Sequence, residues 1–285
     1  MKIAINLSGT QKWPDRSMQA VEMLSKIHDV SVFSHFWKND TETLNRHSWN
    51  FLHAEYLGDA DQNILQYPNL KMFKSENFTD RLEEFEKTFK LIPYHARNAT
   101  QVGPISMFYS MHQCDKLIKE YEQINGTFDL IIRMRFDCRL PDASALDDLP
   151  IGKIIVPHGC DDLWEETPGS LNDLFAVGPS ALMHEYFDVY PNIVDYCKIG
   201  CIFYGEGLCG THILIRRIPV VRRALRFCAH TNEMRNDESF FHPPWRSSFG
   251  VTKYGDVEGV IHKDSPHLER IAWFYRYSPP EPTLA

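Results

Sequence analysis

Short apolar runs alternate with amphipathic segments along most of the chain, and this alternation predicts βα units built around a mainly parallel sheet. The runs KIAINL (2–7) and DVSVFSHFW (29–37) predict the first two strands. Between them, Pro14 and Asp15 precede apolar residues at helical spacing, which predicts a helix. The chain therefore begins with a strand, a helix and a second strand.

The same alternation continues beyond these elements. A third strand is expected over 69–73, and Asp80 and Glu83 have the spacing of a capping box before a mostly exposed helix over 81–89. The remaining expected elements are a long helix from Gly103 that ends at 125–127, strands over 153–157 and 173–178, a helix over 180–190 and a second helix from near Glu206. The fold class expected from this order is α/β.

Composition limits the class of protein further. A chain of 285 residues with 43% hydrophobic content can bury a substantial core, and without an internal repeat or clear linker we expect a single domain over 1–285. The formal net charge of −8 offers no broad basic surface for nucleic acid or anionic membranes. No apolar run approaches the roughly 20 residues that span a bilayer. We therefore expect neither a nucleic-acid partner nor a transmembrane segment.

The cysteines and the N-terminus bear on location. The seven cysteines are an odd number with irregular spacing, and MKIAINLSGTQ lacks the pattern of a signal peptide, so we expect a soluble protein in a reducing, cytoplasmic environment. Cys197 and Cys201 could be metal ligands, but a second pair at zinc spacing is missing. Buried free thiols are the simpler interpretation.

The stretch FDLIIRMRFDCRL (128–140) carries the clearest candidate chemistry. Strand alternation places four charged residues on one side, namely Arg133, Arg135, Asp137 and Arg139. A solvated antiparallel face would show the same pattern. A strand reached through a long crossover helix, however, should lie inside the sheet, where charges need partners, and ligands bind beyond the carboxyl ends of such strands. Several arginines beside a carboxylate suit an anion such as a diphosphate, and the carboxylate could hold a metal or a sugar hydroxyl.

A family resemblance follows from the order of several motifs. VFSHFW (32–37), SMFYSMHQCDKLI (106–118), the arginine stretch, NDLFAVGPSALMHEY (172–186) and GEGLCGTHIL (205–214) resemble, in this order, sugar-nucleotide glycosyltransferases of bacterial polysaccharide clusters and large DNA viruses of algae. The resemblance covers about residues 1–217, and its clearest signature is the R-x-R-x-D strand. A viral member would act in the host cytoplasm.

The resemblance implies both a fold and an activity. The fold is GT-A-like: a Rossmann-like, mainly parallel sheet flanked by helices, with a nucleotide-sugar-binding half (1–140) and an acceptor half (141–285). The activity is transfer of a hexosyl or pentosyl group from a nucleoside diphosphate sugar, with a UDP-sugar as first candidate, to a glycan hydroxyl, with inversion.

The donor-binding residues implied by the resemblance lie at strand ends. Asn6, Ser8 and Gly9 lie in the turn after the first strand, which would face the nucleotide, although an ordinary βα turn has the same composition. His35 and Trp37 end the second strand, where they would stack on a base or ribose, or form a packed aromatic pair. The arginine strand completes the donor site with Arg133, Arg135, Asp137 and Arg139.

Metal use is open at this stage. Asp137 matches the position where GT-A enzymes carry an aspartate-any-aspartate motif for a divalent cation, but the second position is Arg139. Mn²⁺ or Mg²⁺ could bind Asp137, the phosphates and water, with His262 as a further ligand or, alternatively, as a surface imidazole. Without a metal, Arg135 and Arg139 would neutralise the departing diphosphate.

Two carboxylates are candidates for the catalytic base. Glu206 resembles the base of GT-A enzymes in its placement at a helix start, between two glycines that permit close approach. Asp173 is the second candidate, as base or as a ligand of acceptor hydroxyls. Simple helix capping or loop satisfaction is the alternative for both. The acidic loop around Trp164 (160–169) is either an acceptor loop or an exposed turn.

Two other functions compete with glycosyl transfer. A non-catalytic nucleotide- or sugar-binding module would use the arginine strand to bind an anion without chemistry, and it would lack Glu206-dependent donor hydrolysis. A nucleotidyltransferase would carry a glycine-rich, basic phosphate loop early in the chain, and LSGTQKWPDR (7–16) fits that poorly.

Overall fold

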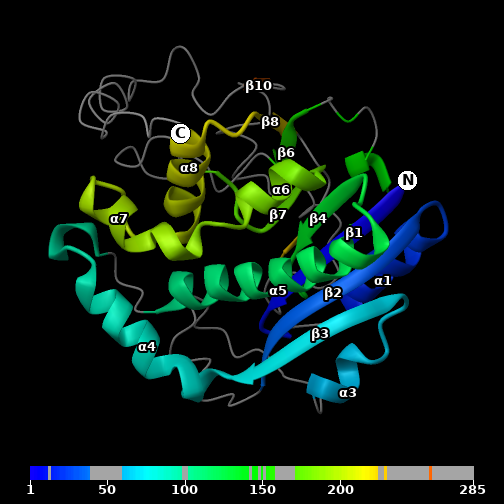
Figure 1. The fold of residues 1–285 in the computed structure, drawn as a ribbon, viewed down its shortest axis with the longest axis horizontal. Helices are drawn as coiled ribbons and strands as arrows, with labels where there is room; N and C mark the ends of the chain where they lie inside the picture. Colours follow the sequence, from blue (N-terminus) through cyan, green and yellow to red (C-terminus); the bar gives the residue numbers. More distant parts are fainter. Residues whose placement is uncertain are drawn as a thin grey trace.

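A single sheet forms the centre of the molecule. The computed structural model describes residues 1–11, 14–38, 60–97, 102–140, 143–146, 149, 152–157, 171–223, 228–229 and 257–258. Within these ranges the sheet has eight strands (Figure 1). In spatial order they are β10 (Val257–Glu258), β8 (Val220–Arg223), β6 (Ile154–Pro157), β7 (Phe175–Pro179), β4 (Leu130–Met134), β1 (Lys2–Gly9), β2 (Asp29–Lys38) and β3 (Leu70–Asn77). A separate pair joins β5 (Cys138–Arg139) to β9 (Cys228–Ala229).

The sheet is mainly parallel. Strands β3, β2, β1 and β4 run parallel to one another, and so do β6 and β8. β7 lies between β4 and β6 and is antiparallel to both, while β10 is antiparallel to β8. The expected α/β class with a mainly parallel sheet is confirmed, and the arrangement is consistent with a GT-A-like, Rossmann-type fold.

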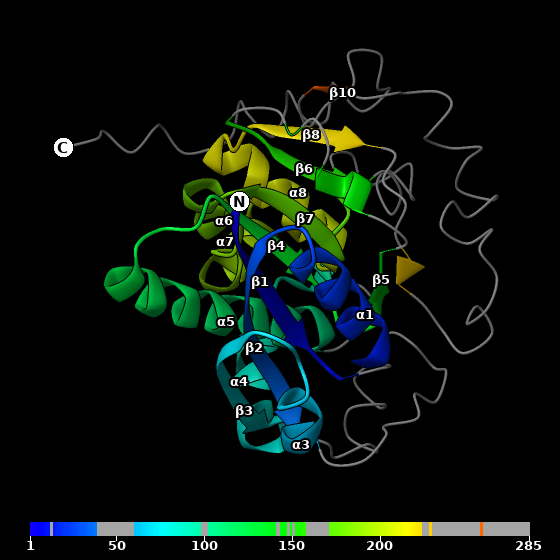
Figure 2. The same ribbon diagram turned by 90° about the vertical axis from the view of Figure 1, so that its right-hand side faces the viewer.

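Helices cover both faces of the sheet (Figure 2). One face carries α1 (Pro14–Ser25) and α3 (Ala60–Ile64). The opposite face carries α4 (Phe78–Leu91), α5 (Gly103–Asn125), α6 (Ser180–Tyr186), α7 (Ile193–Lys198) and α8 (Gly205–Arg216). Short 3₁₀ turns are η1 (Tyr94–Ala96), η2 (Ala143–Leu146) and η3 (Tyr190–Asn192). The donor and acceptor roles assigned to the two halves of this sheet stay a prediction.

Strand alternation decides which side chains face which helices. Odd-numbered residues of β1, such as Ile3 and Ile5, pack in the core beneath α1. Even-numbered residues face α5, where Asn6 Nδ2 donates to the carbonyl oxygen of Met111 at 3.1 Å. The long helix α5 ends at Asn125 and is capped by Gly126, whose φ of 75° suits glycine. Polar residues at even positions of β1 therefore enter the same layer as α5.

The predicted capping box is wrong. α4 begins at Phe78, directly after Asn77, so Asp80 and Glu83 both lie inside the helix. Asn77 Nδ2 instead donates to Asp80 Oδ2 at 2.9 Å. The helix starts here because β3 continues to Asn77 rather than ending near residue 73. This longer strand brings Glu76 into the sheet.

The arginine strand is shorter than expected. β4 ends at Met134, residues 136 and 137 form a turn, and Cys138 begins β5. The amide of Cys138 donates to the carbonyl oxygen of Arg135 at 3.1 Å and closes the turn. The expectation of one continuous strand to Arg139 is therefore wrong, because the chain leaves β4 to pair with β9.

The helix expected over 180–190 is also divided. α6 ends at Tyr186, and the next regular elements are η3 and α7, which were not predicted. Pro191 lies within η3, and proline cannot donate the hydrogen bond that a continuous α-helix would need. The second helix expected from near Glu206 is confirmed, because α8 begins at Gly205.

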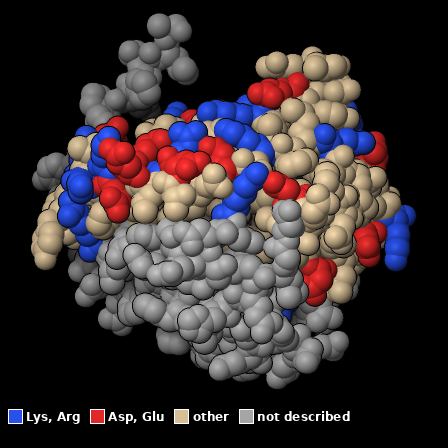
Figure 3. Space-filling model, turned by 90° about the horizontal axis from the view of Figure 1, so that it is seen from below, with Lys and Arg blue, Asp and Glu red and all other residues tan. Residues whose placement is uncertain are grey.

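Two properties of the surface and the helices complete the fold. Lysines and arginines are interleaved with aspartates and glutamates on the described part of the face seen in Figure 3. Across the described ranges, the helices are too short or too polar for any of them to span a membrane.

Candidate functional site

Arg133 is a buried cation without a described partner. It lies in β4 directly opposite Asn6 of β1, on the face of the sheet that packs against α5. Its side chain is 0% exposed, and all three guanidinium nitrogens lack a hydrogen-bond acceptor among the described residues. Burial lowers the pKa of Arg133. A buried guanidinium without hydrogen-bond acceptors is costly even with the Asp173 carboxyl nearby, so the position favours binding of an anion.

Arg135 and Asp137 form a two-point ion pair. Arg135 Nε donates to Asp137 Oδ1 at 2.9 Å, and Arg135 Nη2 donates to Asp137 Oδ2 at 2.6 Å. The Asp137 side chain is only 2% exposed, whereas that of Arg135 is 29% exposed. Burial would lower the pKa of Arg135, but the Asp137 carboxylate outweighs it and raises that pKa overall. Arg135 is therefore charged at neutral pH.

Asp173 joins these residues because β7 is antiparallel to β4. Phe175 near the start of β7 pairs with Met134 at the end of β4, so the residues before β7 lie beside the arginine turn. Asp173 is 5% exposed, and burial raises its pKa while Arg135 and Arg133 oppose that shift. The structure thus brings two arginines and two aspartates together.

The start of α8 lies against this group. A methyl group at Gly205 would overlap Asp173 Oδ2, so only glycine permits the observed approach of helix and carboxylate. The amide of Leu171 donates to the carbonyl oxygen of Glu206 at 3.1 Å, which ties the segment before β7 to the helix. Glu206 is partly buried in the first turn of α8. Both predicted carboxylates therefore lie at this helix start.

The end of β1 contributes uncharged polar groups to the same face. Asn6 Oδ1 and Ser8 Oγ are buried and lack hydrogen-bond partners among the described residues. Gly9 has a φ of 116°, a backbone conformation that favours glycine. Gln11 was not predicted; it is buried, donates from Nε2 to the carbonyl oxygen of Ala60 at 2.9 Å, and leaves Oε1 without a described partner. Only its position in the turn after β1 could have indicated it.

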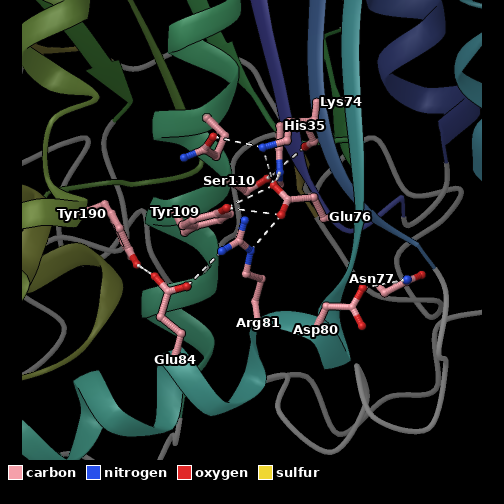
Figure 4. Close-up of polar contacts among 11 residues, drawn as sticks. His35, Lys74, Glu76, Asn77, Asp80, Arg81, Glu84, Tyr109, Ser110 and Tyr190 are labelled. Carbon is pink, nitrogen blue, oxygen red and sulfur yellow. Dashed lines mark hydrogen bonds and ion pairs between the residues drawn. The ribbon is translucent and has the colours of Figure 1, made fainter.

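His35 lies in a packed network rather than at an open stacking site. Its ring is fully buried, with the ring of Trp37 at 5.2 Å in an edge-to-face contact, so the packed aromatic pair describes the geometry. Burial lowers its pKa and keeps the ring neutral. Nε2 then donates to Glu76 Oε1 at 3.0 Å, while the single hydroxyl proton of Ser110 is shared between His35 Nδ1 at 2.8 Å and the His35 carbonyl oxygen at 2.9 Å (Figure 4). The expectation that His35 stacks on a base is therefore not supported by this arrangement.

Glu76 is the centre of the network in Figure 4. Besides His35, it accepts from Lys74 at 2.8 Å, from Arg81 at 2.8 Å and from Tyr109 at 3.0 Å. The hydrogen bond from His35 is the leading cause of a strongly lowered pKa for Glu76, which burial alone would raise. These contacts join β2, β3, α4 and α5. The hydrophobic pattern of the sequence did not indicate these contacts, because the third strand expected from it ends before Glu76.

The described residues do not fit a divalent cation at Asp137. Both carboxylate oxygens already accept hydrogen bonds from Arg135, and a second cation, Arg133, lies near Arg135. Within the described ranges, histidine, cysteine, aspartate and glutamate form no group of three or more suited to a metal ion. His262 and Trp164 lie outside the described residues, and Arg139 lies in β5. Metal dependence stays a prediction.

The cysteines agree with the simpler interpretation. Cys197 and Cys201 are buried free thiols, and burial raises the pKa of Cys201 to about 12. Such thiols are poor metal ligands and poor nucleophiles at neutral pH.

Comparisons with known proteins give limited similarity. No protein-family model matches this chain. A curated protein, the uncharacterized protein C1919.07 of Schizosaccharomyces pombe (strain 972 / ATCC 24843), is 28% identical over 92 residues, which span 32% of this chain and 42% of that protein. Among solved structures, the apo form of mouse xyloside xylosyltransferase 1 is similar over 76% of this chain and 82% of its own, with a TM-score of 0.38 and 9% identity. These values are too low to assign a family or an activity.

Proposed function

We propose that this chain is a glycosyltransferase that moves a sugar from a nucleoside diphosphate donor, with a UDP-sugar as first candidate, to a glycan hydroxyl. The observation that supports it is the buried guanidinium of Arg133, which has no hydrogen-bond acceptor among the described residues, beside Arg135 at the carboxyl end of β4. In open α/β sheets this end of the strands is where ligands bind. A diphosphate offers the anionic oxygens that such a site requires.

In this proposal the two arginines bind and stabilise the leaving diphosphate. As the bond between the anomeric carbon and the diphosphate breaks, negative charge grows on the diphosphate, and fixed cations in a water-poor site stabilise it. Arg133 and Arg135 would supply those cations, and Asn6 Oδ1 and Ser8 Oγ, which lack partners among the described residues, would accept from nucleotide hydroxyl or amide groups. A cation at Asp137 would have to displace Arg135, so no step of the proposal passes through a metal.

Glu206 is the proposed base. It takes the proton of the acceptor hydroxyl while that oxygen attacks the anomeric carbon from the side opposite the diphosphate, which inverts the configuration. The N-terminal end of α8 favours the ionised carboxylate that this role needs. Asp173 is more deeply buried and faces both arginines, so it suits a role in holding the charged group or an acceptor hydroxyl.

Ligand binding is the first test. The melting temperature of the purified chain would be measured with UDP, GDP, ADP, CDP and their sugar conjugates, with Mn²⁺ or with a chelator, because a ligand that binds only the native state raises that temperature. We expect one diphosphate and its sugar conjugate to stabilise the protein in the presence of the chelator. The absence of stabilisation by every nucleotide would remove the donor site from the proposal.

Catalysis is tested with Glu206→Gln. Donor binding should be retained, while transfer and slow donor hydrolysis fall by about 10²- to 10⁴-fold, the usual range for loss of a general base. Glu83→Gln, on the exposed face of α4 where Glu83 pairs with Lys87, is the matched control and should keep full activity. Donor binding without any hydrolysis by the wild type would favour the non-catalytic binding module instead.

A further inference from the structure

Asp137 occupies the edge of Arg135 that a phosphate would use. Nε and Nη2 donate in parallel to its two oxygens, at 2.9 and 2.6 Å. A phosphate bound by two parallel hydrogen bonds to a guanidinium takes the same kind of edge. Asp137 and a donor phosphate therefore compete for one side of Arg135.

The two partners differ in their freedom to move. Asp137 is 2% exposed and lies in the turn closed by the hydrogen bond from the Cys138 amide to the Arg135 carbonyl oxygen. The Arg135 side chain is 29% exposed and has a long, flexible stem. An exchange of partners would consequently move the guanidinium and leave the carboxylate in place.

The neighbouring cation makes such an exchange favourable. Arg133 is fully buried and lacks a described acceptor, so it attracts an anion to the site before Arg135 is released. The arriving diphosphate supplies several acceptor oxygens for the two arginines. Asp137, once released, is a buried carboxylate that needs a donor, and a hydroxyl of the donor sugar has the required chemistry.

We propose that Asp137 is an internal substitute for the diphosphate. It binds Arg135 in the ligand-free site, and Arg135 exchanges this carboxylate for a donor phosphate when a nucleoside diphosphate binds. This inference rests on the proposed function, which supplies the diphosphate. Asp137 is then a positioning residue that weakens diphosphate binding. A metal ligand would have the opposite effect, because its loss would weaken binding.

The test is the dissociation constant of the diphosphate that stabilises the wild type, with UDP as first probe, measured by titration calorimetry in chelator. Asp137→Asn should bind UDP about three- to tenfold more tightly, because the competing charged partner is gone. It should gain less affinity for the UDP-sugar, whose hydroxyl loses a carboxylate acceptor. Asp115→Asn is the matched control: Asp115 is equally buried but pairs with His184 and Lys119, so UDP affinity should not change.

A double-mutant cycle separates competition from simple repulsion between Asp137 and the ligand. Competition requires Arg135, so in an Arg135→Gln background the change of Asp137 to Asn should alter UDP affinity by less than about twofold. Repulsion would act in either background. The exchange of partners is refuted if Asp137→Asn weakens UDP binding, or if the full gain in UDP affinity persists without Arg135.

Failure of this inference can be distinguished from failure of the proposed function. If the wild type binds none of the nucleoside diphosphates, both are refuted. If the wild type binds one of them and Asp137→Asn binds it more weakly, only the exchange of partners is refuted. If the Asp137→Asn variant does not fold, the Arg135 Nε–H resonance of the wild type, assigned by its loss in Arg135→Lys, replaces it. That resonance should shift on saturation with UDP, and an unchanged resonance would overturn the inference.

Discussion

At the scale of single residues, the buried charged side chains of this molecule differ in whether they have hydrogen-bond partners among the described residues. Glu76 accepts from four side chains, and Asp137 is held at both oxygens by Arg135. Arg133 has no acceptor among the described residues. Because a buried charge without a hydrogen-bond acceptor is costly, Arg133 suits ligand binding, whereas Glu76, which is satisfied within the protein, suits a structural role.

Gly205 is the residue that lets Asp173 approach α8. Gly205→Ala should displace the Asp173 carboxylate and lower transfer by about tenfold or more, since small misplacements in a site have large effects on rate. Gly207→Ala is the control, because its methyl group would meet the ring of Tyr204 and not Asp173. Transfer rates per folded molecule would be compared for the two variants. Equal losses would show that Gly205 has no particular link to the site.

At the scale of elements, a histidine joins α6 to α5. His184 Nδ1 lies 2.6 Å from Asp115 Oδ1, and Nε2 lies 2.7 Å from Glu122 Oε2. A neutral imidazole can donate from one nitrogen only, so this geometry requires the charged ring. Lys119 pairs with Asp115, and Ser180 Oγ and the amide of Phe128 donate to Glu122. The pKa of His184 is raised, because the two carboxylates outweigh the effect of burial.

This contact predicts a pH dependence of stability. A raised folded-state pKa means that the stabilisation by His184 is complete below its ordinary value of 6.5 and is lost as pH rises through the folded-state value. The free energy of unfolding in urea should therefore fall less for His184→Gln than for the wild type as the pH rises above 6.5. His95→Gln, in exposed η1, is the control and should retain the wild-type pH dependence. A His184→Gln profile parallel to the wild type would contradict the charged contact.

At the scale of the whole molecule, one sheet crosses the boundary between the two halves expected from the sequence. β4 from residues 1–140 pairs with β7 from residues 141–285 over five residues on each strand. β7 also pairs with β6, which continues the sheet to β8 and β10. The described parts of the halves therefore share a core and should unfold together.

A substitution in β7 can test whether the two halves unfold together. Gly178 lies against Ile154, where an added methyl group would come within 3.0 Å of Cγ1 and 3.2 Å of Cα. Gly178→Ala should cost about 1 to 3 kcal/mol through overpacking. Calorimetry should show a single transition, shifted to lower temperature, and amide exchange should accelerate in both β1 and β6. Two separate transitions, or faster exchange in β6 alone, would show that the halves are independent.

Elements with a local sequence pattern were predictable, whereas features that depend on segments distant in sequence were not. The strands at 2–7 and 29–37 and the helix from Gly103 were predictable because each carries its own hydrophobic period and end signals. The turn at residues 136 and 137 was not, because it depends on pairing between β5 and β9, which are far apart in sequence. The same holds for Glu76, whose inclusion in β3 depends on contacts with β2 and α5.

By itself, the sequence determined the α/β class, the order of the main elements and a concentration of arginines and aspartates at the end of one strand, because these depend on local periodicity and residue type. Tertiary structure alone decided which charges meet. The reversed direction of β7 places Asp173 beside the arginine turn, the turn joins Arg135 to Asp137, and burial beneath the helices leaves Arg133 without a described acceptor. Partner choice among charges depends on distances between segments remote in sequence, which no local pattern encodes.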